Sequence, residues 1–283
     1  MTNNLYIPLN NRAIISVSGN DSATFLQGLI TNDIKKVSSE NAIYALMLTP
    51  QGKYLYDFFI TMKDETYYID CSSEHIDTII KKFSMYKLRS DVKLAKADEY
   101  EAVALIGEKV VSSIDNVRQF CKGVAYIDPR SDKIFARAII ERENEYQSFK
   151  AYEFAEGDIC DYEQTRISLG IPSGDNDLVS GDSFPLDFSM NELNAIDYKK
   201  GCYVGQEVTA RVNYRGKIRK KVYRLQSEEN WPEYGTKITI KDSKSGHLLS
   251  SVKNIALALL RIEDVEKNGN ECNVGAIKAK ITG

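Results

Sequence analysis

Histidine is scarce in this sequence, and no motif gathers metal ligands or a catalytic nucleophile. There are two histidines in 283 residues, His75 and His247. A zinc enzyme usually needs clustered His, Cys or Asp ligands, and the chain has neither a His-Glu-x-x-His motif nor a Cys/His cluster. The Gly-x-Ser-x-Gly elbow and the glycine-rich loops of dinucleotide and P-loop sites are also missing. We therefore expect no zinc hydrolase, no α/β-hydrolase, no nucleotide-binding motif and no metal site.

The cysteines form no recognisable framework. They are five in number, widely spaced and without a Cys-x-x-Cys pair: Cys71, Cys121, Cys160, Cys202 and Cys272. This excludes a disulfide scaffold and a zinc knuckle and predicts a reducing, cytoplasmic location. Residues 1–11 lack a basic segment followed by an apolar one, so no secretory signal is expected. No apolar run approaches the ~20 residues that span a bilayer, so no membrane partner is expected.

Charge is nearly balanced, with 37 basic and 40 acidic side chains and a formal net charge of −3. Bulk charge therefore does not predict a nucleic-acid-binding protein. One basic stretch stands out, with tyrosines interleaved: Tyr214, Arg215, Lys217, Arg219, Lys220, Lys221, Tyr223 and Arg224. It suits RNA phosphates or an acidic partner. Because the run is short and the net charge negative, a solvated strand and loop is the favoured interpretation, and RNA contact the less favoured one.

Helical and strand-like segments alternate along the first 170 residues and predict an α+β fold with largely antiparallel sheets. Residues 144–169 are expected to be mostly helical. Residues 173–187 are rich in Gly, Asp, Ser and Pro. We expect a long ordered loop there, and such loops are often functional. Beyond residue 217, short strands separated by glycines and turn residues predict a small barrel or sandwich.

The segment from Lys199 to Glu207 is the densest candidate for chemistry. Two glycines bracket Cys202 and Tyr203, so the backbone can approach a ligand closely. If the side chains of Lys199 and Lys200 converge on Cys202, they favour its thiolate. The alternative is a buried and inert cysteine, the commoner state of a free thiol.

This segment resembles the signature of the YgfZ/IBA57 family, folate-binding relatives of the glycine-cleavage aminomethyltransferase. The matching residues are Lys200, Gly201, Cys202, Tyr203, Gly205, Gln206, Glu207 and Arg211. The resemblance covers the whole chain, through Phe25-Leu26-Gln27-Gly28 with Thr31-Asn32-Asp33, Gln51-Gly52-Lys53 to Asp57, Tyr86-Lys87-Leu88-Arg89-Ser90, Arg166 with Gly170-Ile171-Pro172, and Gly246 with Ser251.

The resemblance implies a GcvT-like three-lobed ring of two ferredoxin-like α+β lobes and a C-terminal small β-barrel. We expect residues 1–48 with 145–210 to form the first lobe, residues 49–144 the second, and residues 211–283 the barrel. It further implies tetrahydrofolate, or a one-carbon derivative, as the cofactor. The implied role is assembly or repair of [4Fe–4S] proteins, with an indirect effect on tRNA modification. The implied partners are A-type iron–sulfur carriers and [4Fe–4S] client enzymes.

The resemblance also assigns residues to these roles. Cys202 is the catalytic candidate. Asp57 matches the aspartate that faces folate in the transferases, and a carboxylate pairs bidentately with the adjacent N–H groups of a pterin. The other cofactor-binding candidates are Lys200, Gly201, Tyr203, Gln206, Glu207 and Arg211. The alternatives are an edge-strand surface aspartate at Asp57, a core tyrosine at Tyr203 and a surface ion pair at Arg211.

Three function classes stay open: a folate-dependent assembly factor, a glycine-cleavage aminomethyltransferase, and a non-catalytic module that binds RNA or protein. Whether the chain is an enzyme is therefore open too. Ser168 stands where the transferase pattern carries a glutamate, which favours the assembly factor. Iron–sulfur centres usually take four thiolates, so one cysteine predicts no stable cluster in the isolated chain. Any cluster has to be shared with a partner or a second copy.

Overall fold

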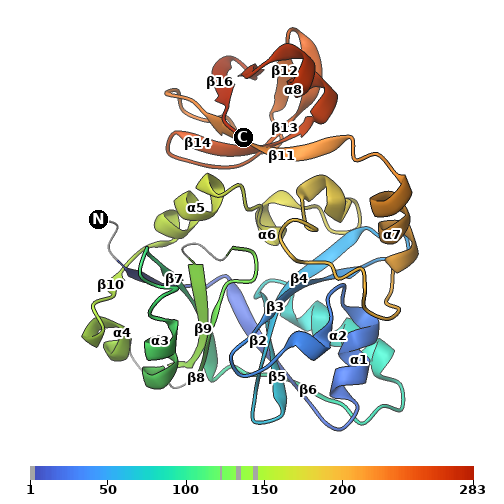
Figure 1. Cartoon of the computed structure of the whole chain (residues 1–283), viewed down its shortest axis with the longest axis vertical. Helices are drawn as coiled ribbons and strands as arrows, with labels where there is room; N and C mark the ends of the chain where they lie inside the picture. Colours follow the sequence, from blue (N-terminus) through green and yellow to red (C-terminus); the bar gives the residue numbers. More distant parts are fainter. Residues whose placement is uncertain (1–3, 122, 132–134, 143–145) are drawn as a thin grey trace. The chain divides into compact units, whose positions relative to one another are not determined.

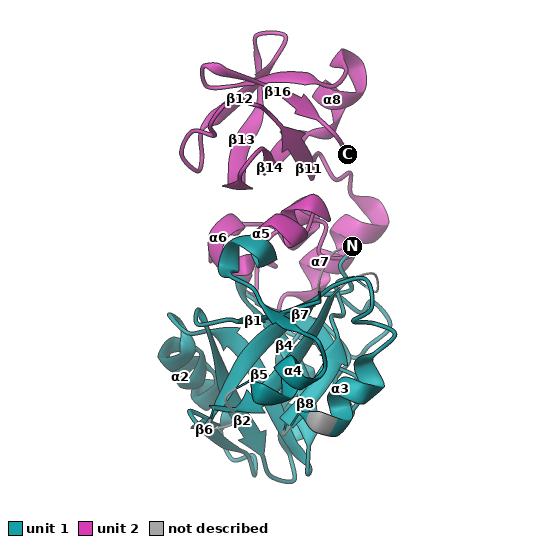
Figure 2. Cartoon of the chain, turned by 90° about the vertical axis from the view of Figure 1, so that its left-hand side faces the viewer, with its two compact units in different colours: residues 1–48, 55–162, 192–204 teal, residues 49–54, 163–191, 205–283 magenta. Residues whose placement is uncertain are grey.

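The computed structural model describes residues 4–121, 123–131, 135–142 and 146–283 (Figure 1). The chain forms two compact units (Figure 2). Unit 1 consists of residues 1–48, 55–162 and 192–204, and unit 2 of residues 49–54, 163–191 and 205–283.

Unit 1 contains two five-stranded sheets. The first has the order β3-β4-β5-β2-β6. Its strands are β2 (Arg12–Ser18), β3 (Ile43–Leu48), β4 (Tyr54–Lys63), β5 (Thr66–Ser72) and β6 (Lys93–Lys96). Helices α1 (Ser22–Leu29) and α2 (Ile76–Lys87) pack on one face of it through apolar side chains at helical spacing (Figure 1). The turn into α1 requires Gly19, whose φ is +109° and where a Cβ would lie 2.3 Å from the carbonyl oxygen of Asp91.

The second sheet has the order β10-β1-β7-β9-β8. Its strands are β1 (Leu5–Pro8), β7 (Tyr100–Ile106), β8 (Gly123–Ile127), β9 (Phe135–Glu141) and β10 (Ala155–Glu156). Helices α3 (Ile114–Phe120) and α4 (Gln147–Ala151) supply apolar side chains to the core on one of its faces. In each sheet, therefore, helices cover one face.

The alternation of side chains along each strand determines what the opposite faces carry. On β5, Ile69 and Cys71 belong to the core under α1 and α2, so Asp70 between them points the other way. On β9, Ala136 and Ala138 belong to the core under α3 and α4, so Arg137 points the other way. Arg137 donates to Asp70 at 2.5 Å. The helix-free faces of the two sheets thus meet across charged side chains.

Unit 2 contains the last part of α5 (Ile159–Ser168), the short α6 (Gly174–Asp177), the 3₁₀ turn η3 (Pro185–Phe188) and α7 (Gln206–Arg215). A closed barrel follows, in the order β11-β14-β13-β12-β15-β16. Its strands are β11 (Lys220–Gln226), β12 (Lys237–Ile240), β13 (Ser243–Val252), β14 (Ile255–Arg261), β15 (Glu271–Val274) and β16 (Ile277–Ile281), with α8 (Ile262–Asn268) after β14.

The predicted α+β class and the C-terminal barrel are confirmed. The predicted lobe boundaries stay a prediction. Residues 144–169, expected to be mostly helical, hold α4, β10 and α5, and residues 144 and 145 lie outside the described residues. The predicted loop at 173–187 includes α6 and the start of η3. Among the described residues, no helix combines the length and apolar character needed to cross a membrane.

Candidate functional site

Cys202 is exposed, on a loop whose two flanks are buried. Lys200 before it is 7% exposed, as is Tyr203 after it. Cys71, Cys121 and Cys272 are buried. The predicted alternative of a buried, inert cysteine is therefore wrong for Cys202, whose thiol is accessible.

The side chain of Lys200 points into the protein. Its ammonium group donates to the carbonyl oxygens of Gln27 at 2.8 Å, Ile30 at 2.6 Å and Asn32 at 2.9 Å. These carbonyls belong to the last turn of α1 and the residues just beyond it, where helix carbonyls have no partner within the helix. Burial lowers the pKa of Lys200 to about 8, while the carboxylates of Asp33 and Asp197 act in the opposite direction.

The chain after Cys202 is attached to the same helix. The Tyr203 ring centroid lies 5.0 Å from the Lys200 ammonium nitrogen. The amide of Val204 donates to the carbonyl oxygen of Gly28 at 3.3 Å, and the Val204 side chain packs on the core of the first sheet. Cys202 is thus spanned by attachments to α1 on both sides.

The residues before Lys200 are held by the Thr31-Asn32 pair that follows α1. The Thr31 hydroxyl donates to the carbonyl of Ala195 at 2.6 Å, and the Asn32 amide donates to that of Asn194 at 2.7 Å. The Asp197 amide donates to the Thr31 carbonyl at 3.0 Å. Residues 25–33, which carry part of the family resemblance, therefore support the loop that contains Cys202.

The rest of the signature lies in unit 2. Gln206 and Glu207 occupy the first turn of α7, and Arg211 follows one turn later, with Glu207 and Arg211 exposed. Gly205 starts this helix with a φ of +85°, which favours glycine. Gly201 is different: it is exposed, and an added Cβ would meet nothing within 4 Å. Packing therefore does not explain glycine at 201, and the loop beside Cys202 is open to a ligand or partner.

Asp57 lies on β4, between β3 and β5, and is 5% exposed. The alternative of a surface aspartate on an edge strand is therefore wrong. Its Oδ2 accepts a hydrogen bond from the Tyr44 hydroxyl at 3.2 Å and lies 3.8 Å from Nη1 of Arg12.

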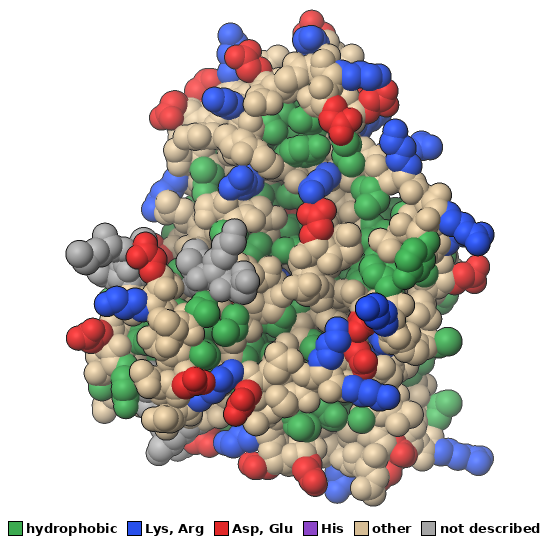
Figure 3. All heavy atoms as spheres, viewed as in Figure 1, with side chains coloured by type: hydrophobic (Ala, Val, Ile, Leu, Met, Phe, Trp, Pro, Cys, Tyr) green, Lys and Arg blue, Asp and Glu red, His purple; other side chains and the backbone are tan. Residues whose placement is uncertain are grey.

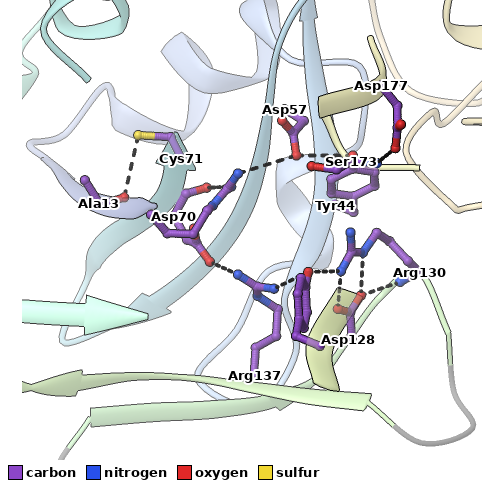
Figure 4. A network of polar contacts seen from close by, with 12 residues as sticks. Ala13, Tyr44, Asp57, Asp70, Cys71, Asp128, Arg130, Arg137, Ser173 and Asp177 are labelled. Atoms are coloured by element: carbon purple, nitrogen blue, oxygen red, sulfur yellow. Dashed lines mark hydrogen bonds and ion pairs between the residues drawn. The ribbon is translucent and has the colours of Figure 1, made fainter. Parts of the chain in front are cut away.

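Asp57 belongs to a set of charged and tyrosine side chains whose other members the sequence did not point to (Figure 4). We call it the inter-sheet network: Arg12, Tyr44, Asp57, Asp70, Asp128, Arg130, Arg137 and Tyr162. At its centre, the Asp70 carboxylate accepts from Nε of Arg12 at 2.6 Å and from Nη2 of Arg137 at 2.5 Å. Burial by itself raises the pKa of Asp70, but the two guanidinium groups outweigh it and lower that pKa.

The other half of the network lies beside β8. Asp128 accepts two side-chain hydrogen bonds from Arg130, at 2.8 and 3.1 Å. The Tyr162 hydroxyl accepts from Arg130 at 3.1 Å and from Arg137 at 3.4 Å. Two guanidinium groups lie over the Phe59 ring. The guanidinium carbon of Arg137 is 3.9 Å from the ring centroid, and that of Arg130 is 4.7 Å from it. The sequence signal for such a network is a single charge inside an apolar strand, as at Asp70 and Arg137.

The basic stretch is mostly exposed at its start, over Arg215, Lys217, Arg219 and Lys220. Arg224 donates to the carbonyl of Ser168 at 2.7 Å. On the face that Figure 3 shows, basic and acidic side chains are interspersed. RNA contact stays the less favoured prediction. In the part of the chain that the structure describes, no group of three or more His, Cys, Asp or Glu residues is placed to hold a metal ion.

Two family models match the chain. The model of the GCVT N-terminal domain matches residues 9–169, and that of the CAF17 C-terminal beta-barrel domain matches residues 219–282. Among solved structures, the glycine cleavage system aminomethyltransferase T from Bartonella henselae superposes with a TM-score of 0.78. The match covers 100% of this chain and 86% of that one at 11% identity. The predicted GcvT-like fold is therefore confirmed.

Curated relatives are iron–sulfur cluster assembly factors of the IBA57 type. The mitochondrial IBA57 homolog of Neurospora crassa is 33% identical over 231 residues, which is 76% of this chain and 52% of that protein. This chain thus matches about half the length of that relative. Mitochondrial IBA57 of Homo sapiens is 29% identical over 91% of this chain and 78% of that protein, with the same values for Mus musculus. The predicted resemblance to IBA57 is confirmed.

The predicted cytoplasmic location is wrong by this comparison, because these relatives are named as mitochondrial proteins. The physical reason is that free cysteines indicate reducing surroundings but not which compartment provides them.

Proposed function

Because the chain belongs to the family of the GCVT N-terminal domain, we propose that it is an iron–sulfur assembly factor of the IBA57 type that works through Cys202. The observation that carries this proposal is the exposed thiol on a loop attached to α1 on both sides. An accessible and firmly placed sulfur suits a ligand that has to meet a cluster on another protein.

The chemistry of the cluster determines what partner the thiol needs. An iron–sulfur centre usually takes four thiolates, and Cys202 supplies one. We propose that an A-type carrier supplies the others and that [4Fe–4S] enzymes receive the product. An indirect effect on tRNA modification is expected through such enzymes. Lowered iron–sulfur enzyme activity in cells without this protein would then reflect failed cluster delivery.

Tetrahydrofolate is the second part of the proposal, with Asp57 as the pterin ligand. The residues fit the group chemically. Asp57 offers a buried carboxylate, Tyr44 is a neighbouring aromatic side chain, and Arg12 is a nearby cation. A pterin needs both oxygens of the carboxylate. The Tyr44 hydroxyl bond to Asp57 is long at 3.2 Å, so it is weak enough to exchange for a ligand.

The transferase alternative depends on a carboxylate near Ser168. The Ser168 hydroxyl donates to the Thr165 carbonyl at 2.7 Å, at the end of α5. A serine there provides no charged acceptor for a pterin. We therefore favour the assembly factor.

The test compares two exposed cysteines in cells that lack the native protein. We expect Cys160→Ser to restore [4Fe–4S] enzyme activity fully and Cys202→Ser to restore none. Both purified variants should unfold at the temperature of the unsubstituted protein, because neither side chain is buried. Full rescue by Cys202→Ser would remove the thiol from the mechanism.

A further inference from the structure

We propose that Lys200 is a positioning residue, which fixes the Cys202 loop to the C-terminal end of α1 and contacts neither cofactor nor cluster. The proposal rests on the proposed function of Cys202. It replaces the cofactor-binding role that the family signature suggested for this lysine.

Every hydrogen-bond donor of the Lys200 side chain is already used. A lysine ammonium group has three N–H bonds and no acceptor. All three find carbonyl oxygens, those of Gln27, Ile30 and Asn32, at 2.6 to 2.9 Å. With its side chain buried, the group has no donor left for a folate carboxylate or a thiolate.

The three carbonyls lie at the C-terminal end of α1. The C-terminal end of a helix carries partial negative charge, which attracts cations. The ammonium group therefore neutralises the end of α1 at the point where the Cys202 loop is attached. The site also needs lysine rather than arginine, because three converging carbonyls match a compact ammonium group and not a planar fork.

Little chain separates Lys200 from Cys202. Gly201 is the one residue between Lys200 and Cys202, and Val204 is bonded to Gly28 in the last turn of α1. The Lys200 amide also donates to Asp197, whose Oδ2 pairs with Lys36 at 2.8 Å. Release of the lysine side chain therefore removes the attachment to α1 nearest Cys202, together with the contact to the Tyr203 ring, and leaves the backbone bonds of Asp197 and Val204 on either side. A ligand side chain needs such support to hold its geometry.

The experiment measures the order of the loop directly. A nitroxide is attached to Cys202 in a Cys160→Ser background, in which the remaining cysteines are buried. Lys200→Met keeps an unbranched side chain that is one atom shorter, and removes the charge and all three donors. We expect its nitroxide to tumble about tenfold faster in the electron paramagnetic resonance spectrum, as for a freed loop. Lys199→Met, an exposed neighbour, is the matched control and should leave the spectrum unchanged.

The same variants, without the label and with Cys160 and Cys202 both present, are tested for rescue of [4Fe–4S] enzyme activity. We expect Lys200→Met to lose at least about tenfold and Lys199→Met to lose nothing. If Lys200→Met does not fold, Lys200→Arg takes its place, because its planar guanidinium keeps the charge but does not match three converging carbonyls. A folded Lys200 variant with an immobile nitroxide would overturn the proposal. If Cys202→Ser rescues enzyme activity while the nitroxide on Cys202 in the Lys200→Met protein is mobile, only the proposed function is refuted.

Discussion

Substitution of Asp70 by asparagine removes the one carboxylate that Arg12 and Arg137 share. Asparagine has nearly the same shape, so the change leaves packing alone and removes the charge. One of the two guanidinium groups then faces an N–H₂ group instead of an oxygen. The carboxylate is fully buried, so water cannot take its place.

The size of the effect follows from what each arginine retains. Arg12 keeps its bond to the Asp70 carbonyl at 2.9 Å and has Asp57 3.8 Å away, while Arg137 keeps the Tyr162 hydroxyl at 3.4 Å. Breaking a buried ion pair on one side costs about 3–5 kcal/mol. We expect a loss in that range, a large part of the ~5–15 kcal/mol that stabilises an ordinary domain.

Urea unfolding followed by circular dichroism measures this loss, with Asp77→Asn as the matched control. Asp77 pairs with Lys96 at 2.8 Å, but its side chain is 81% exposed. Exposed pairs contribute about 0–1 kcal/mol, so the control should hardly shift the midpoint. A loss below about 1 kcal/mol for Asp70→Asn would refute the argument that this network holds the two sheets together.

The remaining predictions concern the ligand and pH. Calorimetry with tetrahydrofolate should show one binding site per chain. Asp57→Ala should weaken the binding free energy by ~1.5–3 kcal/mol, the size of a hydrogen bond to a charged group. Equal affinity in the unsubstituted protein and Asp57→Ala would mean that the site lies elsewhere. Lys200, whose pKa burial lowers to about 8, binds its proton less tightly in the folded than in the unfolded chain. The free energy of unfolding of the unsubstituted protein, relative to that of Lys200→Met, should therefore rise between pH 8 and the ordinary lysine pKa, by up to about 3 kcal/mol. If the urea midpoints of the two proteins change in parallel across that range, this prediction is wrong.

Local patterns in the sequence were enough to predict several features correctly. Short strands separated by glycines predicted a small barrel or sandwich, because turn chemistry and strand length are local properties, and the family resemblance selected the barrel. The signature around Cys202 predicted the family, because a string of that length and composition rarely occurs by chance. The alternation of helical and strand-like segments also follows from spacing, as with the buried Ile76, Ile79 and Phe83 in α2.

Other features depend on residues far apart in the chain. Asp57 is buried because β4 lies between two other strands, and strand order cannot be read from one strand. Asp70 and Arg137 are 67 residues apart, and each alone is an odd charge in an apolar strand. The direction of Lys200 was missed for the same reason: its acceptors lie at least 168 residues away along the chain.

The sequence by itself determined the α+β class, the short strands of the C-terminal part and the family, since these depend on neighbouring residues and short spacings. The tertiary structure alone decided which charges are buried together and which way Lys200 points. It also decided that Cys202 is exposed while its neighbours are not. The reason is that burial and hydrogen bonding of a side chain are set by the segments that pack around it, and here those segments come from distant parts of the chain.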